Sequence, residues 1–194
     1  MTDMHPGGHR LILASSSPRR QHLLKELGFN FEVMVPDVTE VYPEHLSPAE
    51  IALFLAALKS DSIDLSLYPG NTLLITADTI VSIDKDILGK PSDHLEAENM
   101  LKKLSGRKHE VITAVCLRSE KKKIIFHVLS SVIFKDLTSE EITYYVGKYQ
   151  PFDKAGSYGV QEWIGYIGIS RIEGSFFNIM GLPVKELYEA LLQF

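Results

Sequence analysis

LILASSSPRRQHLL, residues 11–24, decides the fold of this chain. A short continuous apolar run such as Leu11–Ala14 predicts a buried strand. Ser17 suits the N-cap of a helix, and Pro18 suits the first helical position, where no backbone N–H is needed. The helix is expected to run to about Leu27, with Gly28 as its C-terminal stop, because glycine commonly ends helices. The stretch therefore predicts a buried strand that leads directly into a helix.

The junction between this strand and this helix gathers groups that bind anions. Unpaired backbone N–H groups, the positive end of a helix dipole, and the side chains of Ser15, Ser17, Arg19 and Arg20 would meet there. That combination predicts a phosphate site without a glycine-rich loop. The alternative is that Ser17 only caps the helix and both arginines face solvent, and this stretch alone leaves both interpretations open.

Composition restricts the class of protein. The chain has 194 residues and a formal net charge of −5, which suits one globular domain, or two small lobes around a shared sheet. The acidic balance argues against a general nucleic-acid-binding surface, so phosphate affinity has to come from a local basic pocket. We expect residues 1–9 to be a flexible tail and residues 10–194 to be a single domain.

Targeting and redox signals are weak. The polar N-terminus lacks the apolar core of a signal peptide, and the purest apolar run, Ile51–Leu58, is too short to span a bilayer. Cys116 is the only cysteine and lies in a strand-like run, so a small buried side chain is expected there. These features predict a cytoplasmic protein with no membrane association.

Apolar runs and capping motifs predict the order of the remaining elements. Strands are expected at Leu11–Ala14, Phe31–Val35, Thr72–Ala77, Val111–Leu117 and Ile124–Phe134. Helices are expected after the capping boxes at Ser47 and Thr138, after Ser92 or Asp93, and from Val184 to Leu192. The pattern predicts an α/β fold with a mixed sheet flanked by helices, in two lobes with a central cleft.

Two carboxylates are candidate metal ligands. Asp78 follows the strand-like run Thr72–Ala77, so it is expected at the carboxyl edge of the sheet, where ligands of open α/β folds bind. There it would coordinate Mg²⁺ or Mn²⁺, or position and deprotonate a water. Glu40 is a possible second metal ligand. The alternatives are an ordinary turn at Asp78 and a surface acid at Glu40.

Three further polar residues are candidates for substrate contacts. Lys90 lies on a corner between Gly89 and Pro91, and Lys59 ends a helix; each is either a cation for a triphosphate or a solvated lysine. Gln161 lies in a segment rich in glycine and aromatic residues, and its amide both donates and accepts, as reading a base edge requires.

Taken in order, these segments resemble the Maf family of nucleoside triphosphate pyrophosphatases. The resemblance covers nearly everything from Leu11 to Leu192. It is carried by Leu13–Arg20, Leu55–Lys59, Ala77–Thr79, Gly89–Pro91, Leu104–Gly106, His109–Val111, Thr113, Asp153–Tyr158 and Ile172–Pro183. Each segment is a weak signal alone, but this many in the same order are very specific. The resemblance implies a fold like that of inosine triphosphate pyrophosphatase.

The resemblance also implies a reaction: hydrolysis of a nucleoside triphosphate between the α- and β-phosphates, with a divalent metal. It assigns Asp78 as general base and Glu40 as a metal-associated carboxylate. It places one group of side chains around the phosphates: Ser15, Arg19, Arg20, Lys59 and Lys90. Ser17, at the same junction as Ser15, is a further candidate for a phosphate contact.

The same resemblance also indicates which nucleobase the substrate carries. Members that prefer dTTP and UTP carry threonine after the aspartate and glutamine in the later loop; Thr79 and Gln161 fit them, with Arg19 the third position tied to selectivity. The expected function is therefore house-cleaning dTTP and UTP hydrolysis, extending to modified pyrimidine nucleotides, by a homodimer. The alternatives are 7-methyl-GTP or a broader nucleotide range, and a non-catalytic nucleotide-binding regulator of cell division linked to septum formation.

Overall fold

A seven-stranded mixed sheet runs through the computed structural model, which describes residues 8–68 and 70–194. The strand order is β2-β1-β3-β5-β6-β7, and β4 pairs with β3. The strands are β1 Arg10–Ala14, β2 Phe31–Met34, β3 Thr72–Ile83, β4 Asp86–Leu88, β5 Lys108–Arg118, β6 Lys123–Phe134 and β7 Ile169–Glu173. Strand β1 is parallel to β2 and β3, whereas β4 and β7 are antiparallel to their partners. This mixed α/β architecture confirms the predicted fold class.

The described chain divides into two compact units, each of which is described by itself. The first contains the chain up to Asp78, Thr113–Val128 and Gly181–Phe194; the second contains Thr79–Ile112 and Leu129–Met180. Strands β3, β5 and β6 therefore each contribute residues to both units. The predicted cleft stays a prediction, and most of the predicted tail, residues 1–7, lies outside the described residues.

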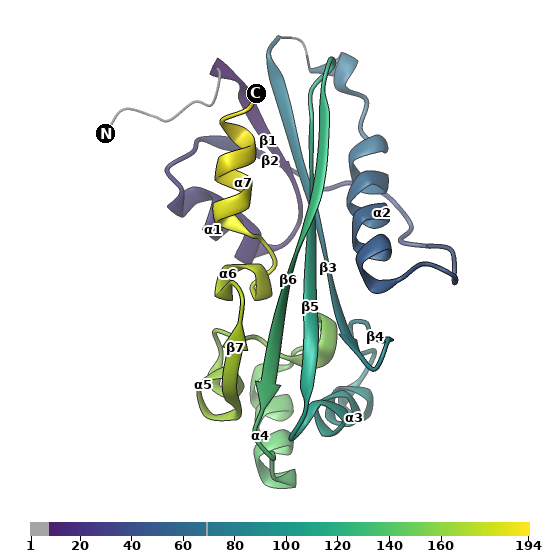
Figure 1. Ribbon diagram of the computed structural model, residues 1–194, viewed down its shortest axis with the longest axis vertical. Coiled ribbons are helices and arrows are strands. Elements are labelled where there is room, and N and C mark those ends of the chain that lie inside the picture. Colours follow the sequence, from purple (N-terminus) through teal and green to yellow (C-terminus); the bar gives the residue numbers. More distant parts are fainter. Residues whose placement is uncertain (1–7, 69) are drawn as a thin grey trace. The chain divides into compact units, whose positions relative to one another are not determined.

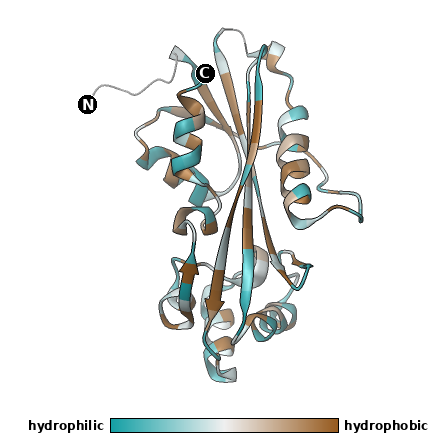
Figure 2. Cartoon of the chain, in the orientation of Figure 1, coloured by the Kyte–Doolittle hydropathy of each residue, from teal (hydrophilic) through white to brown (hydrophobic). Residues whose placement is uncertain are grey.

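Three helices cover the strands of the first unit: α1 Pro18–Glu26, α2 Pro48–Asp61 and α7 Val184–Leu191. Figure 1 shows α2 on one side of these strands, and α1 and α7 on the other. Their buried side chains include Leu24, Leu55 and Leu187, and α7 alternates hydrophilic and hydrophobic residues around its turns (Figure 2). An apolar helix face that meets a β-strand core explains why each helix forms here.

Local capping fixes where these helices begin. Ser17 caps α1 and accepts a hydrogen bond from the Arg20 N–H at 3.5 Å, with Pro18 in the first turn. Ser47 and Glu50 form the capping box predicted for α2. Gly28 follows α1 with φ +80°, a conformation that glycine adopts without strain. The helix starts predicted from the sequence are thereby confirmed.

The second unit has its own hydrophobic core. Its helices are α3 His94–Leu104, α4 Ser139–Tyr149, α5 Trp163–Gly168 and α6 Phe176–Ile179. Leu101, Phe134 and Tyr145 are among its fully buried residues. Asp93 caps α3 and Thr138 caps α4 through a capping box, as predicted.

The prediction that β3 ends at Ala77 is wrong. The strand continues to Ile83, because residues beyond Asp78 pair with β4, for example Val81 with Leu88. Asp84 and Lys85 make the connecting turn with φ of 51° and 73°, and asparagine, aspartate and glycine are the residues that usually tolerate such angles. A polar Asp-Thr pair inside an apolar strand looks like a strand end in the sequence.

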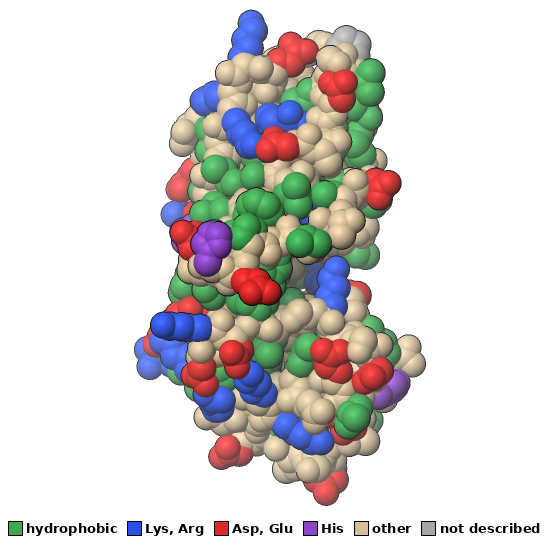
Figure 3. Space-filling model, turned by 90° about the vertical axis from the view of Figure 1, so that its right-hand side faces the viewer, with side chains coloured by type: hydrophobic (Ala, Val, Ile, Leu, Met, Phe, Trp, Pro, Cys, Tyr) green, Lys and Arg blue, Asp and Glu red, His purple; other side chains and the backbone are tan. Residues whose placement is uncertain are grey.

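The face of the first unit that includes α2 is partly apolar. Figure 3 shows hydrophobic side chains gathered on this face, and the exposed apolar residues of α2 and the segment before it include Phe54 and Val41. No helix within residues 8–68 and 70–194 combines the length and the apolar character needed to cross a membrane. Cys116 is fully buried in β5, as expected.

Candidate active site

The junction between β1 and α1 brings serine hydroxyls and an arginine together. Ser15 is buried, and its Oγ accepts a hydrogen bond from the Ser17 backbone N–H at 3.2 Å and another from Arg20 Nη1 at 3.5 Å. Gln21 Nε2 donates to the Ser15 carbonyl oxygen at 3.2 Å. The interpretation in which Arg20 simply faces solvent is therefore wrong, since Arg20 is half-buried and its guanidinium donates to Ser15.

Arg20 is held from a second direction by the C-terminal part of the chain. Its Nε donates to the Gly181 carbonyl oxygen at 2.8 Å. Gly181 has φ +106°, so a glycine is needed at this point of the backbone. Burial lowers the pKa of the Arg20 guanidinium, the negative charge of Asp78 acts in the opposite direction, and the positive charge of Arg19 lowers it further. Two neighbouring guanidinium groups beside a helix N-terminus favour a bound anion.

A buried lysine joins two carboxylates in the same unit. Lys59, in the last turn of α2, places its Nζ 2.5 Å from Asp78 Oδ1 and 2.8 Å from Glu40 Oε1. The side chains of Lys59 and Asp78 are only 10% and 8% exposed, whereas that of Glu40 is 45% exposed. Strand β3 is fixed against α2 nearby, because Thr76 Oγ1 donates to the Ala56 carbonyl oxygen at 2.7 Å. The three groups predicted separately from the sequence thus meet at one point.

Asp78 lies inside β3 and not after its end, which corrects the predicted position at the carboxyl edge of the whole strand. The parallel pairing of β1 with β3 nevertheless stops at Ile75, three residues before Asp78. Asp78 is therefore still beyond the carboxyl end of the neighbouring parallel strand. Ligands of open α/β sheets commonly bind at such a position.

The pKa of Asp78 is raised, and burial is the main cause. The positive charges of Lys59 and Arg20 and the hydrogen bond from Lys59 counteract this effect, whereas the charge of Glu40 adds to it. A carboxylate with a raised pKa is a better proton acceptor than an ordinary one, and its cationic neighbours keep it ionised. This balance suits a general base.

The two carboxylates that contact Lys59 fit a divalent metal ion that also binds the phosphates of a substrate. Asp78 and Glu40 provide carboxylate oxygens that converge within hydrogen-bonding distance of one atom. Within residues 8–68 and 70–194, no group of three or more His, Cys, Asp or Glu residues is arranged to hold a metal ion. Mg²⁺ commonly binds through one or two carboxylates together with substrate phosphates, so two carboxylates are sufficient for such a site.

The other candidate residues belong to the second unit. Thr79 is half-buried in β3, and Lys90 is exposed directly after β4. The Gly89 carbonyl oxygen accepts a hydrogen bond from the Gly156 N–H at 3.1 Å, so the corner that carries Lys90 contacts the segment that leads to Gln161. Gly156 has φ +69° and lies over Val81, where a Cβ would clash. Both features explain why residue 156 is a glycine.

Sequence reasoning missed the polar contacts that hold the segment around Gln161. Tyr145 on α4 donates its hydroxyl hydrogen to Glu162, and Lys154 lies 3.1 Å from the other carboxylate oxygen of Glu162. Tyr158 of the same segment is buried, and its hydroxyl lies 2.8 Å from His109 Nε2. The available signal in the sequence was Tyr145 on the apolar face of α4, but such a position predicts only core packing.

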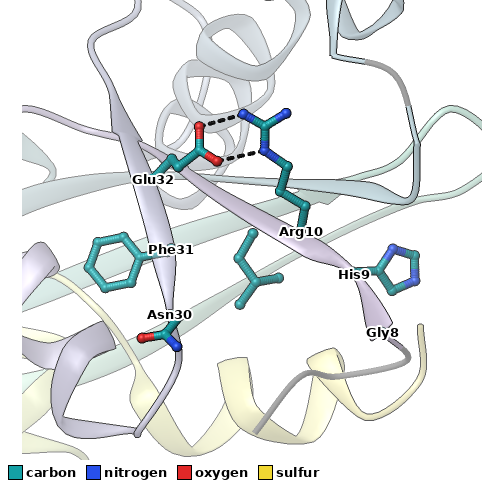
Figure 4. Close-up of a pocket in the computed structure, with 7 residues that line it drawn as sticks. Gly8, His9, Arg10, Asn30, Phe31 and Glu32 are labelled. Atoms are coloured by element: carbon teal, nitrogen blue, oxygen red, sulfur yellow. Dashed lines mark hydrogen bonds and ion pairs between the residues drawn. The ribbon is translucent and has the colours of Figure 1, made fainter. Parts of the chain in front are cut away.

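A separate pocket of about 480 Å³ lies at the opposite ends of β1 and β2 (Figure 4). Its lining consists of Gly8, His9, Arg10, Leu11, Asn30, Phe31 and Glu32. Arg10 and Glu32 form two hydrogen bonds of 2.6 Å with each other. Because this pocket lies at the amino ends of the parallel strands, it is distinct from the cluster around Asp78.

A buried carboxylate paired with a lysine, near two arginines and a helix N-terminus on an α/β sheet, defines a class: proteins that bind polyphosphate ligands. The particular family follows from comparison with known sequences. The profile of the Maf-like protein family matches residues 10–194, and the chain belongs to this family.

Curated relatives match over nearly the whole chain. A Bacteroides thetaiotaomicron protein named dTTP/UTP pyrophosphatase is 52% identical over 184 residues, covering 94% of this chain and 95% of its own length. A protein of the same name from Porphyromonas gingivalis ATCC 33277 is 50% identical over 188 residues, with coverages of 96% and 94%. Among solved structures, the Staphylococcus aureus Ham1 protein is 18% identical over 93% of this chain and 99% of that chain, with a TM-score of 0.47.

Proposed function

We propose that this chain hydrolyses dTTP and UTP to the nucleoside monophosphate and pyrophosphate. The observation that carries the proposal is the contact of the buried Lys59 with Asp78 and Glu40, in the unit that also holds the serine and arginine junction at the start of α1. The names of relatives about 50% identical to the chain support the same reaction. House-cleaning hydrolysis in the cytoplasm, extending to modified pyrimidine nucleotides, is the role we assign to it.

The cationic side chains act on the negative charge of the triphosphate. Phosphoryl transfer needs positioning and charge neutralisation more than covalent chemistry. Arg20 is already fixed by Gly181 and Ser15, so it presents its guanidinium without a large loss of side-chain entropy on binding. We assign phosphate contacts to the following groups: Ser15, Ser17, Arg19, Arg20, Lys59 and Lys90.

Asp78 takes a proton from the attacking water. The water oxygen forms a bond to phosphorus, the bond from that phosphorus to the bridging oxygen breaks, and pyrophosphate leaves with the electron pair of that bond. The proton passes to Asp78, whose pKa is raised by burial and which Lys59 keeps in its ionised form before the reaction. The proton is then returned to solvent, so the carboxylate is regenerated.

Asp78 and Glu40 are the residues that would hold a divalent cation, Mg²⁺ or Mn²⁺. Such an ion would lower the pKa of a bound water and neutralise phosphate charge. Lys59 contacts both carboxylates, so it keeps their oxygens close together. Direct titration of the nucleotide-free protein with Mn²⁺, followed by electron paramagnetic resonance, measures this binding independently of turnover.

Base selection is assigned to Thr79 and Gln161, with Arg19 as the third position. An amide that both donates and accepts is suited to the imide edge that thymine and uracil share. The homodimer implied by the family resemblance is a further proposal, and light scattering of the purified chain tests it.

Pyrophosphate release from a nucleotide panel tests the proposed function. The panel contains dTTP, UTP, CTP, GTP and 7-methyl-GTP, each with Mg²⁺ or Mn²⁺. Release from dTTP and UTP well above the rest is expected. Release from GTP or 7-methyl-GTP alone would keep the reaction and overturn the base assignment, and nucleotide binding without any release would favour the regulator of cell division.

A further inference from the structure

Gln161 lies at the tip of a closed turn in the second unit. The Glu162 N–H donates to the Gly159 carbonyl oxygen at 3.0 Å, which makes Val160 and Gln161 the two central residues. The carbonyl oxygen of Gln161 accepts a hydrogen bond from the Tyr166 hydroxyl at 2.5 Å. One backbone hydrogen bond and one hydrogen bond from the Tyr166 side chain therefore hold the backbone around Gln161.

One hydroxyl ties the two ends of this turn together. Tyr145 accepts a hydrogen bond from the Gly159 N–H at 3.0 Å and donates its own hydrogen to Glu162. Tyr145 is fully buried, and its ring stacks on that of Tyr149 with the centroids 5.1 Å apart. The hydroxyl is thus presented by a side chain that is itself immobilised by packing.

The Glu162 side chain is confined on two further sides. Lys154 Nζ, also buried, lies 3.1 Å from Glu162 Oε1. A Cβ added to Gly159 would lie 2.6 Å from the Glu162 Cδ, so the carboxyl group rests directly against the backbone at the start of the turn. These contacts leave the turn little room to adopt another conformation.

The orientation of the Gln161 amide matters because an amide is nearly symmetric. Rotation by 180° exchanges its donor and acceptor, and that exchange would match the reversed pattern of cytosine as well as that of uracil and thymine. Gln161 Oε1 is buried and accepts no hydrogen bond from the described residues, so no such bond fixes the amide. The surrounding turn has to supply the rigidity that discrimination requires.

We propose that Tyr145 and Glu162 are positioning residues that hold Gln161 in one orientation and thereby set the preference for thymine and uracil over cytosine. The inference rests on the proposed function, which assigns base recognition to Gln161. Both residues act through the turn from Gly159 to Glu162.

Replacing Tyr145 with phenylalanine removes the hydroxyl and keeps the ring. The ratio of kcat/KM for dTTP to that for dCTP is expected to fall roughly 3- to 10-fold, the effect of losing one net hydrogen bond, with the loss mainly in KM for dTTP. Tyr144→Phe is the matched control, because Tyr144 lies on the same helix but is exposed, and its hydroxyl accepts a hydrogen bond from the Lys148 amine at 2.8 Å. The control is expected to keep the wild-type ratio.

A double variant separates positioning from a general loss of structure. Gln161→Ala is expected to lower the same ratio, and adding Tyr145→Phe to it is expected to lower the ratio no further. Glu162→Gln keeps an acceptor for Tyr145, so its ratio is expected to lie between those of the wild type and Tyr145→Phe. This variant tests the proposal if Tyr145→Phe does not fold. The proposal is overturned if both Tyr145→Phe and Glu162→Gln keep the wild-type ratio of kcat/KM. It is also overturned if Tyr145→Phe lowers this ratio by the same factor in the Gln161→Ala background as in the wild type.

The outcomes also distinguish this inference from the proposed function. If the wild-type protein releases no pyrophosphate from dTTP, or if Gln161→Ala leaves the ratio unchanged, base reading by Gln161 fails and the positioning role fails with it. If the wild type and Gln161→Ala behave as expected but the Tyr145 and Glu162 variants do not, only the positioning role is lost.

Discussion

Lys59 in the first unit and Lys154 in the second each expose only 8% of the whole residue, and each contacts two carboxylates. Their surroundings differ. The buried partner of Lys59 is Asp78, whose pKa is raised by burial and on which the positive charge of Arg20 also acts. The less exposed carboxylate partner of Lys154 is the half-buried Glu162, which also accepts the hydroxyl hydrogen of Tyr145.

The comparison shows that burial of a lysine does not by itself indicate catalysis. Around Lys154, the polar groups are satisfied by one another and the result is a rigid turn. Around Lys59, charges of both signs gather where a carboxylate has an altered proton affinity and where an anion is favoured. Perturbed ionisation together with nearby cations, and not burial alone, indicates a reaction centre.

The largest expected effect is the loss of turnover in Asp78→Asn. Amide nitrogen and oxygen cannot accept the proton of the attacking water, and general-base catalysis typically contributes about 10²- to 10⁴-fold. Pyrophosphate release from dTTP should fall by that factor. Asp86→Asn is the control, because Asp86 makes an exposed ion pair with Lys103. Comparable losses in both variants would remove Asp78 from the reaction.

The second effect concerns acid stability and His109. Burial lowers the pKa of His109 from 6.5 to about 4, so the unfolded chain binds a proton at pH values where the folded chain does not. Stability is therefore complete above pH 6.5 and falls as the pH drops towards 4, by about 3 kcal/mol in total. Urea unfolding at several pH values should show a shallower decline in His109→Gln than in the wild type.

His127→Gln is the control for that measurement, since His127 is exposed in β6. It should keep the wild-type dependence of stability on pH. Parallel curves for wild type and His109→Gln would show that His109 already binds its proton in the folded protein near its ordinary pKa.

A smaller loss of stability is expected in Lys154→Met. The variant leaves Glu162 without its cation, but Glu162 keeps the Tyr145 hydrogen bond and is 20% exposed. The free energy of unfolding should fall by roughly 2 kcal/mol, below the cost of breaking a fully buried pair. Denaturant titration measures this change, and an unchanged midpoint would mean that Lys154 does not stabilise the turn.

The smallest effect is expected at the exposed pair of Arg10 and Glu32, which lines the pocket of Figure 4. Exposed pairs contribute little, so Arg10→Ala should change the melting temperature by no more than about 2 °C. Turnover of dTTP should be unchanged, because the pocket lies at the opposite strand ends from Asp78. A marked loss of turnover would show that this pocket takes part in the reaction.

Local signals made much of the fold predictable from the sequence. Ser17, Ser47 and Thr138 start helices through contacts within three residues, so their caps could be identified without knowledge of the fold. The end of β3 could not be predicted from local sequence, because pairing with β4 prolongs the strand. Strand β7 was missed as well, since its pairing partner, β6, lies more than thirty residues earlier.

The candidate site was predictable as a set of residue types but not as an arrangement. Asp78 and Lys59 are 19 residues apart, and only the packing of α2 on β3 brings them together. The link between Tyr145 and Glu162 spans 17 residues and depends on where α4 ends. Such contacts between separate elements carry no periodic signal in the sequence.

The most direct test of the central claim is to measure kcat for dTTP in Lys59→Met and Lys154→Met side by side, with folding checked by circular dichroism. We predict a loss of at least about 100-fold in Lys59→Met, typical of removing one preorganised electrostatic contact. In Lys154→Met, kcat should stay within a few-fold of wild type while the preference for dTTP over dCTP declines. Equal losses of kcat in both variants would contradict the division between a reaction centre around Lys59 and a positioning element around Lys154.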